Sequence, residues 1–342
     1  MTQHSSDHLN NPYNNWHGKP YYSLDAYCKN TYGEKLYKTA LNAGLSCPNR
    51  DGTLDYRGCI FCSAGGSGDF AVPIRDSQGI TTRNLFSDAL SKGRDSLSGK
   101  HTGHKQIAYF QAYTNTYGSL EYLEQIYRFA LDDPSVAGIS IATRPDCLPE
   151  SVIYLLTSLQ RECTPKFVWV ELGLQTIHPQ SASFIRRGYP LSCFDEALFR
   201  LCQAEIPVIT HVILGLPGET TEDMLETINY LNQKPVWGIK LQLLHILKNT
   251  DLAILFDKDP VTYGSFSTMD AYLDTLILCL LQLRPDMVVH RVTGDAPQEL
   301  LLAPFWSTNK RQVLNTLHRR MKEQGAFQGK NFRKDGSLCM TH

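Results

Sequence analysis

KFVWVELGLQT (166–176), LSCFDEALFRLCQAE (191–205) and PVITHVILGLPG (207–218) follow one another in the middle of the chain and contain the repeating unit of its fold. The first and third segments are near-continuous apolar runs of strand length, whereas the segment between them has the spacing of an amphipathic helix. Strands that are apolar on both faces are typical of a buried parallel sheet, in which a helical crossover joins one strand to the next. These three segments therefore predict a β-α-β unit.

The same alternation continues on both sides of this unit. The other strand-like runs, each followed by a loop or an amphipathic helical pattern, are residues 36–44, 105–114, 136–146 and 238–247. Six strand-helix units, instead of the eight of a closed barrel, predict an α/β fold in the form of a partial (β/α)6 TIM-like barrel. We expect an irregular N-terminal wrap at 1–34, the barrel at 35–285, and a C-terminal helical extension with a basic helix and tail at 286–342.

Bulk composition restricts the class of protein. The 342 residues are 42% hydrophobic and 20% charged, and no apolar run is long enough to cross a membrane. The N-terminal segment lacks the basic and apolar regions of a signal peptide, so we expect a cytoplasmic protein with no membrane partner. Ten cysteines in a chain of this length do not form the dense disulfide framework of a small secreted domain. Because the net charge is −1, a nucleic-acid partner must be argued from local patches.

SCPNRDGTLDYRGCIFCSAGG (46–66) follows the first predicted strand and carries three cysteines, Cys47, Cys59 and Cys62. Their clustering on a Gly-rich loop indicates a metal site. Thiolates select zinc or iron-sulfur clusters, but a structural zinc site is closed by four protein ligands, and no other Cys or His lies within this stretch. A cubane cluster held by three cysteines leaves one iron open to a small molecule. The alternatives are a zinc site that borrows His101 or His104, and three unrelated buried cysteines.

Polar residues at the predicted strand ends are candidates for a site, because the chemistry of parallel barrels sits at the carboxyl ends of the strands. Strand alternation places Glu171 and Gln175 on one face, where they would point at the mouth of the barrel. Glu171 lies within a buried strand and needs a polar partner, such as Arg144 in an internal ion pair. Arg144 has an alternative structural partner in Asp146. Gly215 would let a flat ligand lie against the backbone or let the strand turn sharply.

Five motifs, GLSCPNRDG, GCIFC, TRPD, ELGLQT and GLPGE, occur in this order at predicted strand ends. From Tyr21 to the region of Pro304, the chain resembles the radical S-adenosylmethionine (SAM) superfamily, and in particular its bacterial YtqA/YhcC-type group, which is related to the elongator catalytic subunit. The resemblance implies a [4Fe-4S] cluster held by Cys47, Cys59 and Cys62, whose open iron binds SAM. It also implies reductive cleavage of SAM to a 5'-deoxyadenosyl radical, with electrons from an external donor of the flavodoxin or ferredoxin type.

The resemblance assigns further residues to SAM. Phe61 matches an aromatic residue that lies near the adenine, and Ile213 and Gly215 match the middle of an adenine-lining motif. Arg187 would pair with the carboxylate of SAM, with Arg186 as the alternative. The other implied contacts are Thr114 and Asn115 for the amino group, Ser140 and Thr143 for the ribose hydroxyls, and Arg144, Glu171 and Gln175.

Three titratable residues at the rim are not needed for SAM. His245 ends the sixth predicted strand, and HRVTGD (290–295) contains His290 and Asp295. We expect these three to act on the substrate side, with His290 or Asp295 as a proton carrier. A structural histidine is the alternative for His245 and for His290.

The substrate expected from the resemblance is a wobble-uridine side chain in tRNA. Between residues 309 and 334 the sequence has eight Lys or Arg and one acid, Glu323, so this segment could contact nucleic acid or could form a solvated helix face. The alternative functions are a radical SAM reaction on a small molecule, as in tetrapyrrole metabolism, and a zinc-stabilised binding protein.

Overall fold

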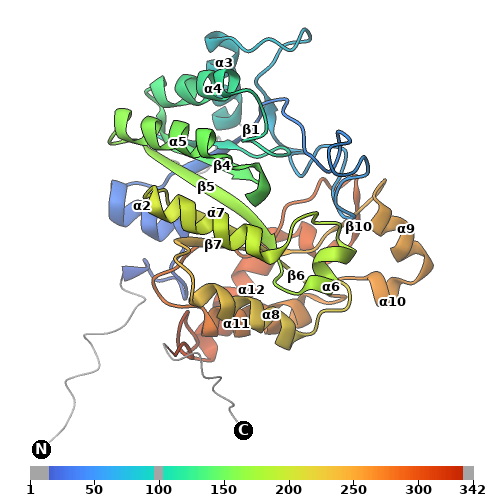
Figure 1. Cartoon of the computed structure of the whole chain (residues 1–342). Helices are drawn as coiled ribbons and strands as arrows, with labels where there is room; N and C mark the ends of the chain where they lie inside the picture. The colour runs from blue at the N-terminus through green and yellow to red at the C-terminus, as the bar shows by residue number, and fades with distance from the viewer. Residues whose placement is uncertain (1–14, 96–102, 334–342) are drawn as a thin grey trace, which may run out of the picture.

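Eight parallel strands form the central sheet of the computed structural model, which describes residues 15–95 and 103–333. The strand order is β2-β1-β3-β4-β5-β6-β7-β9, and the order does not close on itself among the described residues, so the barrel is incomplete (Figure 1). The predicted α/β partial barrel is therefore confirmed. The strands are β1 Tyr37–Asn42, β2 Val72–Pro73, β3 Gln106–Phe110, β4 Val136–Thr143, β5 Phe167–Gln175, β6 Val208–Leu214, β7 Gly238–Leu243 and β9 Val288–Arg291.

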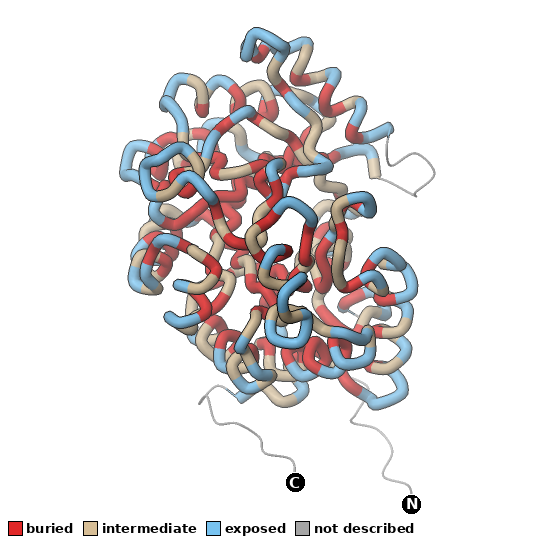
Figure 2. Tube along the Cα trace, turned by 90° about the vertical axis from the view of Figure 1, so that its right-hand side faces the viewer, coloured by how far each residue is buried: buried red, intermediate tan, exposed pale blue. Residues whose placement is uncertain are grey.

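The helices that connect these strands are amphipathic and bury their apolar faces against the sheet or against one another. In α4, Ser119 caps the N-terminus and Leu123, Ile126 and Tyr127 are buried, as the helical spacing predicts. The main helices are α2 Leu24–Tyr32, α3 Arg83–Asp95, α4 Leu120–Asp132, α5 Glu150–Glu162, α6 Pro179–Phe184, α7 Leu191–Gln203, α8 Thr221–Asn232, α9 Asp251–Lys258, α10 Pro260–Tyr263, α11 Met269–Gln282 and α12 Lys310–Glu323. Figure 2 shows that buried residues concentrate inside the trace and that exposed residues lie on its outer turns.

The structure differs from the sequence prediction at both ends of the barrel. Helix α2 forms within the segment that was expected to be irregular, and β9 adds a strand beyond residue 285, beside β7. The predicted strand 238–247 is divided, because β8 (Ile246–Leu247) leaves the main sheet and pairs antiparallel with β10 (Leu301–Ala303). These elements are short, so their apolar periodicity is too brief to identify them from sequence.

The amino end of the barrel is closed by an apolar and largely aromatic cluster. Trp169 of β5 and Trp237 contact each other, with ring centroids 4.6 Å apart, and Tyr27 of α2 packs on both rings. Leu36, Ile107 and Ile209 belong to the same cluster. This cluster therefore packs at the amino ends of the strands, and its member Leu36 also lines the cavity inside the barrel.

Within residues 15–95 and 103–333, no helix is long and apolar enough to cross a membrane.

The packing of α5 on the sheet gives a matched test of the fold. Leu156 is fully buried, whereas Tyr154 on the same helix is 75% exposed. We expect Leu156→Ala to reduce the free energy of unfolding by about 2–5 kcal/mol, because it removes buried methyl groups and leaves a cavity. Tyr154→Ala, the control, should change it by less than about 0.5 kcal/mol. Urea denaturation of the metal-free protein measures both values, and equal losses would contradict this packing.

Candidate active site

A cavity of about 810 Å³ lies inside the barrel and opens at the carboxyl ends of the strands. Most of the residues predicted for the site line this cavity, although they come from loops and strands far apart in sequence. Those that line it are Cys47, Cys59, Phe61, Cys62, Thr114, Thr143, Arg144, Glu171, Gln175, Arg187, Ile213, His245, His290 and Asp295. Three predicted residues, Asn115, Ser140 and Gly215, are not part of its lining.

The cysteine loop, residues 46–66, follows β1 and presents three free thiols to the cavity. Cys59 and Cys62 lie on one tight turn, in which the Cys62 amide donates to the Cys59 carbonyl at 3.0 Å. The Arg50 guanidinium donates to the Cys62 and Ser63 carbonyls, each at 2.7 Å. Asn49 Nδ2 lies 3.6 Å from Cys59 Sγ. The loop is thus fixed by its own polar side chains, and the sulfur atoms of Cys59 and Cys62 make only long contacts of 3.6–3.7 Å, which a ligand could replace.

The spacing and chemistry of these thiols fit an iron-sulfur cluster better than zinc. The three Sγ atoms do not all lie within 4.8 Å of one another, whereas thiolates bound to one tetrahedral zinc ion at 2.3 Å are about 3.8 Å apart. Burial, followed by the neighbouring thiols, raises the pKa of Cys59 to about 12, so this site needs a cationic group to ionise it. His104, one proposed zinc ligand, is exposed and does not line the cavity, and His101 lies outside the described residues.

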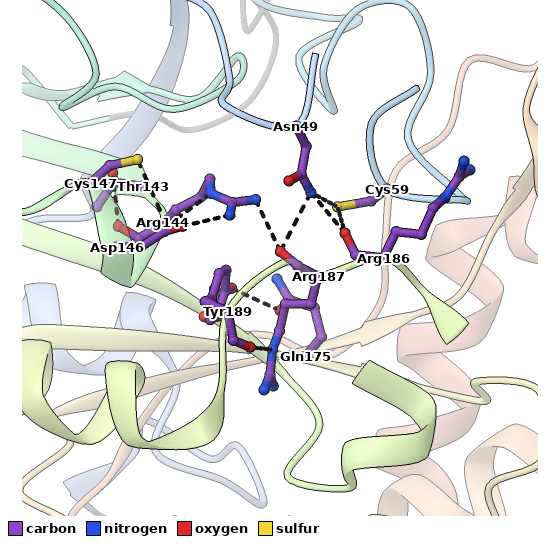
Figure 3. A network of polar contacts seen from close by, with 11 residues as sticks. Asn49, Cys59, Thr143, Arg144, Asp146, Cys147, Gln175, Arg186, Arg187 and Tyr189 are labelled. Carbon is purple, nitrogen blue, oxygen red and sulfur yellow. Dashed lines mark hydrogen bonds and ion pairs between the residues drawn. The ribbon is translucent and has the colours of Figure 1, made fainter. Parts of the chain in front are cut away.

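A second loop, residues 186–189, packs against the cysteine loop (Figure 3). Asn49 Nδ2 donates to the Arg186 carbonyl at 2.8 Å, and Arg144 Nη1 donates to the Arg187 carbonyl at 3.1 Å. Gly188 has φ +83°, and a Cβ at this position would lie 2.8 Å from Asn49 Oδ1. Only glycine therefore permits this close approach, which holds the two loops together at the mouth.

The arginines at the mouth have partners within the protein. Arg144 forms an ion pair with Asp146 at 2.7 Å, the structural alternative that the sequence left open. Arg187 donates to the backbone carbonyls of Leu174 and Thr176, at 2.9 and 2.8 Å, and of Tyr189 at 3.1 Å. Burial lowers the pKa of Arg187. Its contact with a SAM carboxylate stays a prediction, and these bonds show that the side chain also anchors its own loop.

Arg186 has a partner on another element. Its guanidinium forms an ion pair with Asp251 of α9 at 2.6 Å, and Arg186 does not line the cavity. Arg187 is therefore better placed than Arg186 to face a ligand.

One wall of the cavity is apolar. Phe61 and Ile213 both line it and belong to a common cluster with Ile60 and Ile185. This wall is suited to the flat face of a purine, and the adenine contact of both residues stays a prediction. Gly215 lies behind the wall, where a Cβ would come within 2.7 Å of Ser265 Oγ.

Polar atoms without partners lie on the opposite side. Thr114 Oγ1 and Asn115 Oδ1 are buried and have no hydrogen-bond partner among residues 15–95 and 103–333, so the side chain of Thr114, which lines the cavity, is suited to bind a ligand. Asn115 Nδ2 donates to the Ala142 carbonyl at 3.0 Å. Thr143 Oγ1 lies 2.5 Å from Thr116 Oγ1, which places its hydroxyl in a structural contact.

The deepest part of the cavity is a charged layer that we call the polar floor, made of Lys38, Tyr109, Glu171, His211, Lys240 and His290. Glu171 does have an internal ion pair, but its partners are Lys38 and Lys240 and not Arg144. His211 Nε2 lies 2.6 Å from Glu171 Oε2, and Ser140 Oγ donates to Glu171 Oε1 at 2.5 Å.

Sequence reasoning missed both lysines of the polar floor. A charged residue inside an apolar strand was the signal that identified Glu171, and the same signal is present at Lys38 in β1 and Lys240 in β7.

His245 and Asp295 occupy one side of the cavity. His245 Nε2 lies 3.0 Å from Ser307 Oγ, and burial lowers the pKa of this histidine to about 4. Asp295 forms ion pairs with Arg291, at 3.0 Å, and with Lys310. Near neutral pH His245 is therefore uncharged and Asp295 is ionised. The role of either residue as a proton carrier stays a prediction.

The lowered pKa of His245 predicts a pH dependence of stability. Between pH 6.5 and about 4 the unfolded chain binds a proton at this residue that the folded chain does not, so stability falls as pH falls through this range. We expect a loss of about 3 kcal/mol from this group. His245→Asn should flatten the dependence, whereas His104→Asn, at an exposed position, should not. Urea denaturation between pH 4 and 8 measures this; identical slopes for wild type and His245→Asn would refute it.

Comparison with known proteins agrees with this geometry. A model of the radical SAM superfamily matches residues 55–231, and a model of the radical SAM C-terminal domain matches residues 236–323. The protein YtqA of Bacillus subtilis is 40% identical over 323 residues, which cover 94% of this chain and 96% of YtqA. YhcC of Escherichia coli K12 is 32% identical over 296 residues, covering 86% and 90%.

More distant similarity extends to elongator proteins. Human Elongator complex protein 3 is 27% identical over 236 residues, which are 68% of this chain and 38% of that protein. The solved structure of an archaeal Methanocaldococcus infernus Elp3 with an N-terminal deletion has a TM-score of 0.60 at 14% identity, covering 87% of this chain and 64% of the other. At that identity the likeness shows a shared fold. Together, the matched family models and the two bacterial relatives show that this chain belongs to the radical SAM superfamily, whose members use a [4Fe-4S] cluster and SAM.

Proposed function

We propose that this radical SAM enzyme remodels the side chain of a wobble uridine in tRNA. When bound, the cluster and SAM supply a 5'-deoxyadenosyl radical that removes a hydrogen atom from the substrate. The observation that carries the proposal is the single cavity that joins three free thiols at its mouth to a charged floor at its base. A substrate group that enters this cavity is held between the two.

The residues of the mouth have separate tasks in this proposal. Cys47, Cys59 and Cys62 hold the cluster, and Asn49, beside Cys59 Sγ, tunes it by hydrogen bonding. Phe61 provides an apolar surface for the adenine. The two loops that pack together at the mouth exclude water from the interior and fix the direction in which the ligand lies.

Several observations support a nucleic-acid substrate. Part of the family that the sequence resembles acts on wobble uridines, and the chain is similar to Elongator complex protein 3 over 68% of its length. The cavity can receive a base that is extruded from a loop of single-stranded RNA. Phe70 lines the cavity and is 58% exposed, which is the kind of aromatic surface on which bases stack.

The basic C-terminal helix gives less support than its composition suggested. Arg320 of α12 forms ion pairs with Asp270 and Asp274 of α11, and Arg319 pairs with Glu323. Its positive charges are therefore largely balanced within the protein, so we place the tRNA contact at the cavity mouth. Lys334 and the rest of the tail lie outside the described residues.

Radical SAM enzymes need an external electron donor. We propose a flavodoxin- or ferredoxin-type protein for this role.

The cluster assignment is tested by metal analysis. Anaerobically purified protein should be brown and contain about four iron and four sulfide ions per chain. The Cys47, Cys59, Cys62 triple Ala variant should lose both, because it removes every thiolate that faces the cavity mouth. Cys202→Ala, at an exposed cysteine, is the matched control and should retain them. Zinc in place of iron, with no visible absorbance, would refute the cluster.

The substrate assignment is tested by nucleoside analysis of bulk tRNA from strains with and without the gene. We expect one modified wobble uridine to disappear and its precursor to accumulate. Complementation with the wild-type gene should restore the profile, and the triple Ala variant should not. Unchanged wobble nucleosides, with SAM cleavage still measurable in the purified enzyme, would exclude tRNA and favour a small-molecule substrate.

A further inference from the structure

The polar floor contains more positive than negative charge. Lys38 and Lys240 both form ion pairs with Glu171, which is the only carboxylate of the floor within the described residues. The Glu171 side chain is fully buried, and those of Lys38 and Lys240 are 15% and 5% exposed. Two ammonium groups therefore share one carboxylate in a place that bulk water barely reaches.

Other ionised groups of the cavity wall do not supply the missing negative charge. Arg291 and Asp295 balance each other at 3.0 Å, and Arg144 is balanced by Asp146. Asp69 follows the cysteine loop in the chain and accepts a hydrogen bond from Ser63 of that loop. The floor is thus suited to one additional anion from outside the protein.

Hydrogen-bonding capacity on the floor is also unused. Lys38 Nζ has one strong partner, Glu171, and two longer contacts, to His290 Nδ1 at 3.3 Å and to Ser140 Oγ at 3.4 Å. His290 Nε2 is buried without a partner. Lys240 Nζ donates to Tyr109 Oη at 2.9 Å as well as pairing with Glu171. Lys38 is the more exposed of the two lysines, at 15% against 5%, and two of its three contacts are long, so a ligand can replace these contacts more readily.

Small residues lie between the floor and the mouth. The cavity is lined by Ala40, Ala142 and Gly173, which follow Lys38, Ser140 and Glu171 by two positions on their strands. Gln175 fills part of the space beside Gly173, where a Cβ would lie 2.6 Å from its Nε2 atom. On its other side the floor meets the aromatic cluster, since Trp169 and Trp237 both contact the His290 ring.

We propose that the polar floor binds a carboxylate group of the substrate, with Lys38 as its direct partner and with Lys240 holding Glu171 in place. A monoanion matches the excess of one positive charge, and a carboxylate accepts the donors of a lysine in several geometries. Burial lowers the pKa of both lysines, and a bound anion would reverse this effect and keep them charged. This inference deepens the proposed function, because it names the chemical class of the group that enters the cavity.

Acetate binding tests the floor without turnover. Isothermal titration calorimetry would use the cluster-loaded protein with saturating SAM and no reductant, so that the iron is already occupied, at constant ionic strength. Lys38→Met should weaken acetate binding at least about tenfold, because it removes a charged donor while keeping the length of the side chain. Lys258→Met, at an exposed position on α9, is the matched control and should bind as wild type. Acetamide, which has the same shape but no charge, should not bind.

A second variant is expected to increase the affinity for acetate. Glu171→Gln removes the resident carboxylate and keeps its shape, so acetate should bind about tenfold more tightly than to the wild type. A damaged fold cannot produce this gain. Acetate binding that is absent in the wild type, or equal in wild type and Lys38→Met, would overturn the proposal.

Different experimental results would contradict the carboxylate inference and the tRNA assignment. If the precursor nucleoside that accumulates without the gene forms a methyl ester in acidic methanol, it carries a carboxylate, and both are supported. A neutral precursor would overturn the carboxylate while leaving tRNA as substrate. Unchanged tRNA would overturn the substrate alone, because the acetate titration does not depend on it.

Discussion

Burial of the Glu171 carboxylate inside the barrel is the constraint on which the arrangement of the barrel interior depends. An ionised carboxylate in an apolar interior is tolerated only when it is paired and hydrogen-bonded. Glu171 finds its partners on strands that are far apart in the sheet order, since Lys38 belongs to β1 and Lys240 to β7. Both ammonium groups can reach the same carboxylate only if the sheet curves until β1 and β7 face each other. The charge pairing and the barrel curvature therefore require each other, and Glu171 links the strands across the space that they enclose.

Much of the fold could be predicted because its signals are local. Near-continuous apolar strands such as β4, which is buried along its whole length, and capped amphipathic helices such as α8 are readable from periodicity and cap residues. The strand β9 has four residues and no following helix in the same rhythm, so nothing local distinguishes it from a loop. Helix α2 was missed because its nine residues are mostly polar or aromatic, and its packing against β9 cannot be seen in its own sequence.

Some residues of the candidate site could likewise be identified from their local sequence, whereas others could be identified only from the three-dimensional structure. The rule that function sits at the carboxyl ends of parallel strands brought the three cysteines, Phe61 and His245 to one cavity without knowledge of the pairing register. The partners of Glu171 required that register. The ion pairs of α12 also depend on spatial information, since the acids that pair with Arg320 lie on α11.

The cysteine loop at the cavity mouth and the polar floor lie at opposite ends of one cavity, so a single substrate can contact both. Arg50 and Asn49 hold the cysteine loop by hydrogen bonds, and the pairing of Glu171 with two lysines holds the floor, so both ends have internal partners without a ligand. A substrate whose charged end is held at Lys38 has its remaining atoms directed through the layer of small side chains toward the mouth. The distance between the charged group and the reacting carbon would then be set by the protein. Under this arrangement, selectivity for one hydrogen atom follows from where the anion is held, and the radical chemistry itself need not distinguish among similar C–H bonds.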